Sequence, residues 1–265
     1  SLSLAGAGYL NPSAISQKKN PSIFDKKRSF TLSIINYKSD ISSQSLGSFF
    51  PIYNGYASLS IRNLSYGVFE SYDENKIFQG TYQSSDNWLT FSYAKKLKNL
   101  PITTGLSYNF FNSNLASYQI RKSFFTIGAN IIIQKIKTTL GFSLHQLNFK
   151  KNSYNIVDPN FVFSILKGLE HLPLNMFLDF VFYDYATNLE FFLGSEFKLS
   201  ENINFLIGSS SRKLSQNIEY NFFNTIFGST GIGLDYHKKP YKFNIGSYMY
   251  GTGYFISGVQ LDIEF

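Results

Sequence analysis

The 265-residue sequence contains no cysteine, which excludes a disulfide framework and any metal site built from thiolates. It also lacks any run of about 18 consecutive apolar residues, so it predicts no transmembrane helix. Tryptophan occurs once and histidine three times, which leaves few side chains for imidazole chemistry. These absences exclude disulfide-rich secreted domains and helical membrane proteins.

Aromatic residues are abundant instead, with 28 Phe and 19 Tyr making up most of an 18% aromatic content. A soluble core needs far fewer, whereas a membrane barrel carries aromatic girdles at its two interfaces. The mean hydropathy of −0.11 is close to neutral. This value fits a barrel, because half of its spanning side chains face a polar lumen. Composition therefore favours a transmembrane β-barrel.

The last thirteen residues, 253–265, alternate between apolar and polar side chains. Phe255, Val259 and Leu261 share one face, whereas Gln260 and Asp262 lie on the other. Successive side chains of a strand point to opposite faces, so this stretch predicts a strand with one apolar side. It ends on Phe265, which we interpret as the signal for barrel closure and assembly, because the last strand of a barrel pairs with the first. The alternative is an edge strand of a soluble β-sandwich.

Similar segments recur along the chain and predict an all-β, transmembrane antiparallel barrel of about fourteen strands, an even number typical of bacterial barrels. The expected strands are 29–37, 44–53, 55–71, 81–94, 102–112, 123–133, 135–148, 160–169, 172–183, 188–199, 202–211, 230–237, 241–250 and 253–265. We place the barrel at residues 28–265. Residues 1–27 are rich in small side chains and predict a plug in or just below the lumen, with a flexible leader as the alternative.

The strand at 188–199 indicates which face meets lipid. Leu189, Phe191 and Leu193 alternate with the charged Glu190 and Glu196. A lysine at the bilayer midplane costs roughly 2–4 kcal/mol, and acidic residues cost somewhat less, so the apolar face points outward. We also interpret the single tryptophan, at position 88, as an anchor at the membrane interface.

Connections after even-numbered strands are short, whereas three connections after odd-numbered strands are long, at 72–80, 150–159 and 214–229. Short periplasmic turns and long extracellular loops are typical of outer-membrane barrels, so both chain ends are expected in the periplasm. The chain begins at Ser1 without a charged or apolar leader, and we interpret it as mature, with its export signal removed.

The net charge of +7 arises from scattered lysines, many of them at expected turns. Basic charge attracts nucleic acid, anionic lipid or polyanionic glycan. Scattered turn lysines are more typical of solvated turns than of a binding patch. We find no nucleic-acid motif and expect no nucleic-acid partner.

Candidate catalytic groups are few. Asp235 and His237 share a face of one expected strand, and His145 faces inward on another, but no serine motif completes a hydrolytic site. We favour a hydrogen-bonded structural pair and predict neither enzymatic activity nor a cofactor or metal. The two Gly-x-Gly stretches, at 231–233 and 251–253, are interpreted as bends or as gaps for inward aromatics. Tyr248 and Tyr250 are expected to face the lumen.

Three stretches in the middle of the chain carry a family resemblance: ASLSIRNLSYGVFESYDEN at 57–75, GTYQSSD at 80–86 and LTFSYAKK at 89–96. They resemble the PorQ/PorV family of FadL-like outer-membrane barrels of the type IX secretion system, with PorQ-like members the nearer match. Residues 108–117 and 166–173 are also similar. So is the small-residue run 4–8 with Asn11 and Pro12, although Ser13 stands where the family has alanine.

The resemblance implies a non-enzymatic barrel of the bacterial outer membrane, surrounded by lipid and lipopolysaccharide. It serves as a platform for attaching secreted proteins to the cell surface and holds a PorZ-like partner, or PorU and cargo if it is PorV-like. We expect partner binding at Tyr72, Asp73, Glu74, Lys76, Tyr154, Asp158, Tyr220, Phe222 and Phe223, and a plug motif at Gly6, Gly8, Asn11 and Pro12. The alternative function is a FadL-like transporter of hydrophobic solutes, and a weaker one is a soluble all-β secreted domain.

Overall fold

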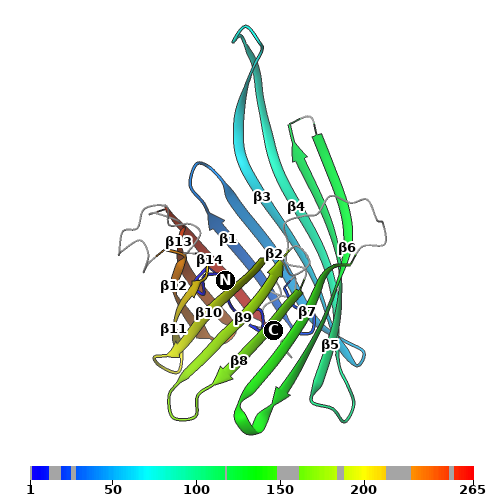
Figure 1. Ribbon diagram of the computed structural model, residues 1–265, viewed down its shortest axis with the longest axis vertical. Coiled ribbons are helices and arrows are strands. Elements are labelled where there is room, and N and C mark those ends of the chain that lie inside the picture. The colour runs from blue at the N-terminus through cyan, green and yellow to red at the C-terminus, as the bar shows by residue number, and fades with distance from the viewer. Residues whose placement is uncertain are drawn as a thin grey trace.

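The computed structural model is a closed antiparallel β-barrel of fourteen strands (Figure 1). It describes residues 2–11, 19–24, 28–116, 118–147, 161–183, 188–212, 228–250 and 254–265. Each strand pairs with its neighbours in sequence, and β14 closes the sheet on β1. The predicted fold class is therefore confirmed. In the described part of the chain, no helix has the length and apolarity needed to cross a membrane.

The observed strands agree closely with the alternation in the sequence. They are β1 (Ser29–Asn36), β2 (Ser42–Ile52), β3 (Gly55–Tyr72), β4 (Phe78–Lys96), β5 (Ile102–Leu115), β6 (Tyr118–Ile133), β7 (Thr138–Leu147), β8 (Phe161–Gly168), β9 (Leu174–Tyr183), β10 (Asn188–Lys198), β11 (Ile203–Ser210), β12 (Thr230–Lys238), β13 (Tyr241–Tyr250) and β14 (Tyr254–Glu264). A short 3-10 turn, η2 (Gln134–Ile136), joins β6 to β7.

The outer face of the barrel is apolar, as the sequence predicts. Leu189, Phe191 and Leu193 of β10 are 45–50% exposed, while Glu190 and Glu196 turn inward and bond to other side chains. Exposed apolar side chains follow the same alternation around the barrel at Leu32, Leu46, Ile61, Phe91, Leu106, Ile127, Phe142, Ile207, Ile232, Leu234, Ile245 and Val259. A closed sheet leaves no unpaired edge, so this face can meet lipid.

The prediction that Trp88 anchors a membrane interface is wrong. Trp88 is 7% exposed and lies on the inward face of β4. The Arg62 guanidinium carbon lies 4.0 Å from the centroid of its ring, and the ring of Phe111 lies 4.9 Å away, centroid to centroid. From Ser84 to Ala94 the even-numbered residues of β4 face the lumen, so alternation along the strand outweighs the general preference of tryptophan for interfaces.

Barrel closure depends on the pairing of β1 with β14. Leu32 lies opposite Leu261 on the outer face, and the Thr31 hydroxyl donates to the Asp262 carboxylate at 2.5 Å inside. The backbone N–H of Phe265 donates to the Arg28 carbonyl at 3.1 Å. Phe265 itself is 75% exposed, so its ring extends beyond the sheet.

The two ends of the barrel differ. Short turns after even-numbered strands form one end of the barrel. Short turns are typical of the periplasmic end of outer-membrane barrels, a relation we call the loop rule, so this end is assigned to the periplasm. At the other end the β3–β4 hairpin rises well beyond every other strand (Figure 1). Its strands have 18 and 19 residues, whereas about 9–11 span a membrane, so the hairpin projects outside the bilayer.

A lysine placed on the outer face tests this orientation. Ile245 lies mid-strand in β13 and is 49% exposed, whereas its neighbour Asn244 lines the lumen. Ile245→Lys should lower the free energy of unfolding in lipid by roughly 2–4 kcal/mol, because its ammonium group would face hydrocarbon. Asn244→Lys should lower it much less, because its ammonium group would face the polar lumen. Reversible urea unfolding in phospholipid vesicles measures both, and an equal loss in the two variants would contradict the assigned faces.

Candidate functional site

The described N-terminal residues lie inside the barrel (dark blue in Figure 1). We call residues 2–11 and 19–24 the inner segment. Leu4 and Ala7 are fully buried, and they pack with side chains from the strand walls. Those wall residues are Val162, Phe177, Val181, Phe192 and Leu206. A small apolar core therefore joins the inner segment to β8–β11.

Glycines in the wall allow the inner segment to approach the sheet closely. A Cβ atom at Gly208 would lie 2.3 Å from the Leu4 carbonyl carbon, and one at Gly231 would lie 2.1 Å from the Leu2 oxygen. The same holds at Gly105 against Pro21, and at Gly128, Gly141, Gly233 and Gly246. The interpretation of Gly231 and Gly233 as gaps for inward aromatics is thus corrected: the inner segment occupies the space they leave.

Asp179 of β9 anchors the first part of the inner segment. Its carboxylate accepts hydrogen bonds from the backbone N–H groups of Gly8, at 2.7 Å, and Tyr9, at 3.4 Å. Gly8 has a φ of +89°, a left-handed conformation that favours glycine. Since Asp179 is only 1% exposed, its carboxylate depends on these donors in place of water.

Lys19 completes this anchor from the second part of the inner segment. Its ammonium group donates to the Gly6 carbonyl at 2.8 Å and lies 4.6 Å from the centroid of the Tyr9 ring. Burial lowers the pKa of Lys19, and the charge of Asp179 opposes that shift. The two parts of the inner segment are therefore tied to each other as well as to the wall.

Residues 19–24 bind the opposite wall. The Asn130 amide of β6 donates to the Ser22 carbonyl at 2.8 Å and to the Ser22 hydroxyl at 3.1 Å. Asn20 donates to the Phe142 carbonyl at 3.4 Å, and the ring of Phe24 stacks on Tyr56 with centroids 4.0 Å apart. The inner segment thus spans the lumen between two anchors.

A chamber of about 560 Å³ remains between the inner segment and the wall of β1 and β12–β14. One part of its lining is apolar and aromatic, formed by Leu2, Ile35, Tyr37, Leu206, Tyr248, Tyr250 and Ile256. Another part is charged, formed by Lys19, Arg62, Arg212, Asp235, Lys242 and Asp262. The volume is that of a site for a small molecule, and the mixed lining suits an amphipathic one.

Ion pairs hold the charged part of the chamber in place. Lys242 binds Asp235 at 3.1 Å, and Arg212 binds Glu190 at 2.9 Å while also donating to the Tyr183 hydroxyl at 3.0 Å. The chamber is lined by four cationic side chains and two acidic ones, so its lining is net positive.

The structure does not pair Asp235 with His237. Asp235 forms its ion pair with Lys242 rather than a hydrogen bond with His237, so the expected Asp235–His237 pair is wrong. His145 does face inward, where its ring lies 2.9 Å from the Ser143 hydroxyl. Across the described residues, no group of three or more His, Asp or Glu side chains could hold a metal ion.

The structure places the predicted site residues in separate regions. Gly6, Gly8 and Asn11 line the chamber, whereas Tyr72 is the last residue of β3. Asp73, Glu74 and Lys76 form the tight turn of the hairpin, in which the Asp73 carboxylate accepts N–H bonds from residues 75 and 77. The expected loop at 72–80 is therefore a hairpin tip. Pro12, Tyr154, Asp158, Tyr220, Phe222 and Phe223 lie outside the described residues.

Sequence reasoning missed Asp179, Lys19 and Ile35. A signal for Asp179 existed, because it is the single charge in the apolar stretch LNMFLDFVFY of β9. A lone carboxylate on the inward face of such a strand requires donors from within the lumen. Lys19 and Ile35 had no comparable signal.

Removing the Asp179 carboxylate should loosen the inner segment. Because the chain has no cysteine, Ser3→Cys gives a single near-isosteric reporter at a fully buried position. In Asp179→Ala, maleimide labelling of this cysteine should be at least about tenfold faster, since the Gly8 and Tyr9 N–H groups lose their acceptor. Asp86→Ala is the control, because Asp86 binds Tyr66 of the wall. Equal labelling rates in both variants would refute the anchor.

Comparison with known proteins identifies the fold. No protein-family model matches the chain, and no curated sequence matches it. Solved structures do. The Ralstonia pickettii toluene transporter TbuX has a TM-score of 0.60 and 11% identity, covering 96% of this chain and 94% of its own. The P. putida toluene transporter TodX has a TM-score of 0.55 and 8% identity (98% and 94%). A Pseudomonas aeruginosa FadL homologue has a TM-score of 0.55 and 10% identity (99% and 96%).

At these identities the likeness concerns the fold. The closed fourteen-stranded sheet, its apolar exterior and these neighbours confirm the predicted architecture and location. The closer resemblance to PorQ and PorV stays a prediction, as does the division at residue 27. The chain has the FadL-like barrel fold and is an integral protein of the outer membrane.

Proposed function

We propose that this barrel binds small hydrophobic or amphipathic solutes in its lumen and passes them across the outer membrane without chemical change. The observation that carries the proposal is the chamber between the inner segment and the wall of β1 and β12–β14. Its size suits a single small molecule, and the inner segment forms one of its sides.

The lining suits a molecule with an apolar body and a polar or anionic end. Ile35 and Ile256 would contact the apolar body, and Tyr248 and Tyr250 would add flat surfaces. Arg212 and Lys242 lie on the charged part, where each already has an acidic partner. A small anionic group of the solute could therefore bind beside Arg212 and Lys242 while both ion pairs remain in place.

The solved structures of similar fold support the same class of solute. TbuX and TodX are described as toluene transporters, and a TodX variant as a monoaromatic hydrocarbon channel. Those descriptions belong to those proteins. For this chain they make a hydrophobic solute the natural first ligand to test.

Filling the chamber with a larger side chain should weaken binding of a hydrophobic solute. Ile35 lines the chamber, whereas its neighbour Ile34 is 37% exposed on the outer face. Ile35→Trp should weaken binding of radiolabelled toluene or decanoate at least about tenfold, because the indole occupies space the solute needs. Ile34→Trp carries the same change into lipid and should bind as the unaltered chain does. Equilibrium dialysis of the purified protein measures both. Absence of saturable binding by the unaltered chain would overturn the proposal.

We propose as a second candidate function a platform that binds a surface protein, the role implied by the resemblance to barrels of the type IX secretion system. The projecting hairpin supports protein binding. Pairing of β3 with β2 extends no further than Ser65, and pairing of β4 with β5 begins at Ser85. Among the described strands, the hairpin beyond these points pairs only with itself. Yet Val68, Ile77 and Phe78 are 55–60% exposed there. An apolar surface on a two-stranded ribbon in water is typical of a protein-binding site.

Removing two aromatic rings tests the platform. Tyr72 and Phe78 pack edge to face, with ring centroids 5.8 Å apart, near the tip of the hairpin. Tyr72→Ser with Phe78→Ser should reduce recovery of a surface partner at least about tenfold when the barrel is purified from its own outer membranes in mild detergent. Tyr118→Ser, which removes a 76% exposed ring at the same end, is the control. Mass spectrometry that finds no stoichiometric partner with the unaltered barrel would exclude this function.

A further inference from the structure

Lysines that are scattered in the sequence gather at one end of the barrel. Five of the six short turns, or the strand ends beside them, carry at least one. Outside the lumen, the basic residues of this end are Arg28, Lys95, Lys96, Lys98, Lys135, Lys137, Lys167, Lys198, Lys238 and Lys239, and all but Lys167 are exposed. The acidic residues there are Glu170, Glu201 and Glu264. We call this set of basic residues the basic rim.

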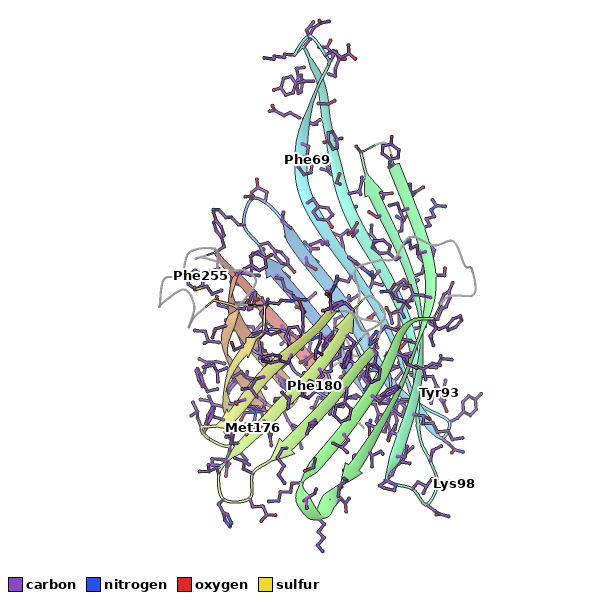
Figure 2. The ribbon with its side chains drawn as sticks, in the orientation of Figure 1. Phe69, Tyr93, Lys98, Met176, Phe180 and Phe255 are labelled. Atoms are coloured by element: carbon purple, nitrogen blue, oxygen red, sulfur yellow. The ribbon has the colours of Figure 1, made fainter. Side chains whose placement is uncertain are left out.

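The opposite end has no such excess among its described residues. Outside the lumen its charged side chains are the basic Lys38, Lys76, Arg121 and Lys122 and the acidic Asp40, Glu70, Asp73 and Glu74. These balance. The positive charge of the described exterior is therefore concentrated at the end that the loop rule assigns to the periplasm. Figure 2 shows Lys98 at this end and Phe69 on the hairpin at the other.

Outward tyrosines place the basic rim at the depth of the lipid head groups. Tyr93, Tyr236 and Tyr241 are 40–56% exposed on the outer face, as expected of an aromatic girdle at the membrane interface. Lys95 and Lys238 each follow one of these tyrosines by two residues. Two residues of a strand span roughly 7 Å, so these lysines lie just beyond the hydrocarbon boundary.

Exposed apolar side chains alternate with the lysines in the turns themselves. Lys98 lies between Leu97 and Leu100, which are 37% and 49% exposed, and Ile136, 45% exposed, lies between Lys135 and Lys137. Leu172 and Leu199 are 58% and 64% exposed in two further turns. This pairing suits a lipid interface, where apolar groups reach the acyl chains and the ammonium groups reach the head groups.

The distribution of the basic rim around the barrel favours lipid over protein as its ligand. The basic rim follows the turns from β4–β5 to β12–β13 rather than forming one compact patch. An acidic protein would contact only part of it, whereas the lipids that surround a barrel contact all of it. We propose that the basic rim selectively binds anionic phospholipid head groups of the periplasmic leaflet. This proposal rests on the fold and is independent of what the lumen carries.

Native mass spectrometry of the full chain with defined lipids tests the proposal. The detergent-solubilised barrel is mixed with equal amounts of phosphatidylglycerol and phosphatidylcholine that have matched acyl chains. The unaltered chain should retain at least about tenfold more phosphatidylglycerol, and the preference should fall as sodium chloride rises, because salt screens exposed charges. Equal retention of the two lipids by the unaltered chain would overturn the proposal.

Three variants identify the residues responsible. Replacing Lys98, Lys135, Lys137, Lys198, Lys238 and Lys239 by glutamine should bring the ratio of retained phosphatidylglycerol to retained phosphatidylcholine close to one. Replacing the same residues by arginine keeps the charge and should keep the preference. Replacing Lys38, Lys76, Arg121 and Lys122 by glutamine changes the other end and should leave it unchanged. If the glutamine variant of the rim folds and keeps its preference, the proposal is wrong. It is also wrong if an acidic periplasmic protein displaces phosphatidylglycerol from the unaltered chain.

Discussion

The close approach of the inner segment to the barrel wall is the constraint on which the lumen depends. Backbone can meet backbone at Gly208 and Gly231 only because neither wall residue has a Cβ atom. Close approach removes water from the backbone polar groups, so buried partners must replace it. Asp179 supplies an acceptor at one end of the segment, and Asn130 supplies a donor at the other. Packing at the glycines and bonding at these two residues thus require each other.

The same constraint creates the chamber. Residues 2–11 lie chiefly against β8–β13 and residues 19–24 against β5–β7, so the lumen is filled unevenly. The space that remains faces β1 and β12–β14, where Ile35 and Ile256 provide an apolar surface. Movement of the inner segment would change the size of this space directly. The site is consequently a property of the assembled barrel and segment, and no single strand contains it.

Much of the fold could be predicted because β-structure has a period of two. Alternation at Leu189 to Leu193 fixed the outer face, and the terminal strand indicated closure. The same rule places Trp88 of β4 inside, beside Asp86 and Thr90, and it outweighs the preference of tryptophan for membrane interfaces. The expected loop at 72–80 is shorter in the structure because pairing continues past an irregularity between Ser71 and Tyr72, where Tyr72 lies opposite Phe78 and Gly80 has a φ of +123°.

The candidate site could be predicted only in part. The predicted plug residues Gly6, Gly8 and Asn11 and the predicted inward Tyr248 and Tyr250 all line the chamber. The backbone N–H of Gly8 also binds Asp179. The partners of the wall glycines could not be found, because no sequence pattern relates Leu4 to Gly208 across the 203 residues between them. The basic rim was hidden for the same reason, since only strand order brings Lys98 and Lys238 to one end.

A disulfide test addresses the position of the inner segment most directly. The chain has no cysteine of its own, and a Cβ atom built at Gly194 would lie 3.1 Å from the Cβ of Ala7. This is slightly shorter than the usual Cβ separation of about 3.5–4.5 Å in a disulfide, so a small shift suffices. The double variant Ala7→Cys with Gly194→Cys should form an intramolecular disulfide in the outer membrane, seen by mass spectrometry of the joined peptides. A correctly folded double variant whose cysteines both remain free to react with maleimide would contradict the account.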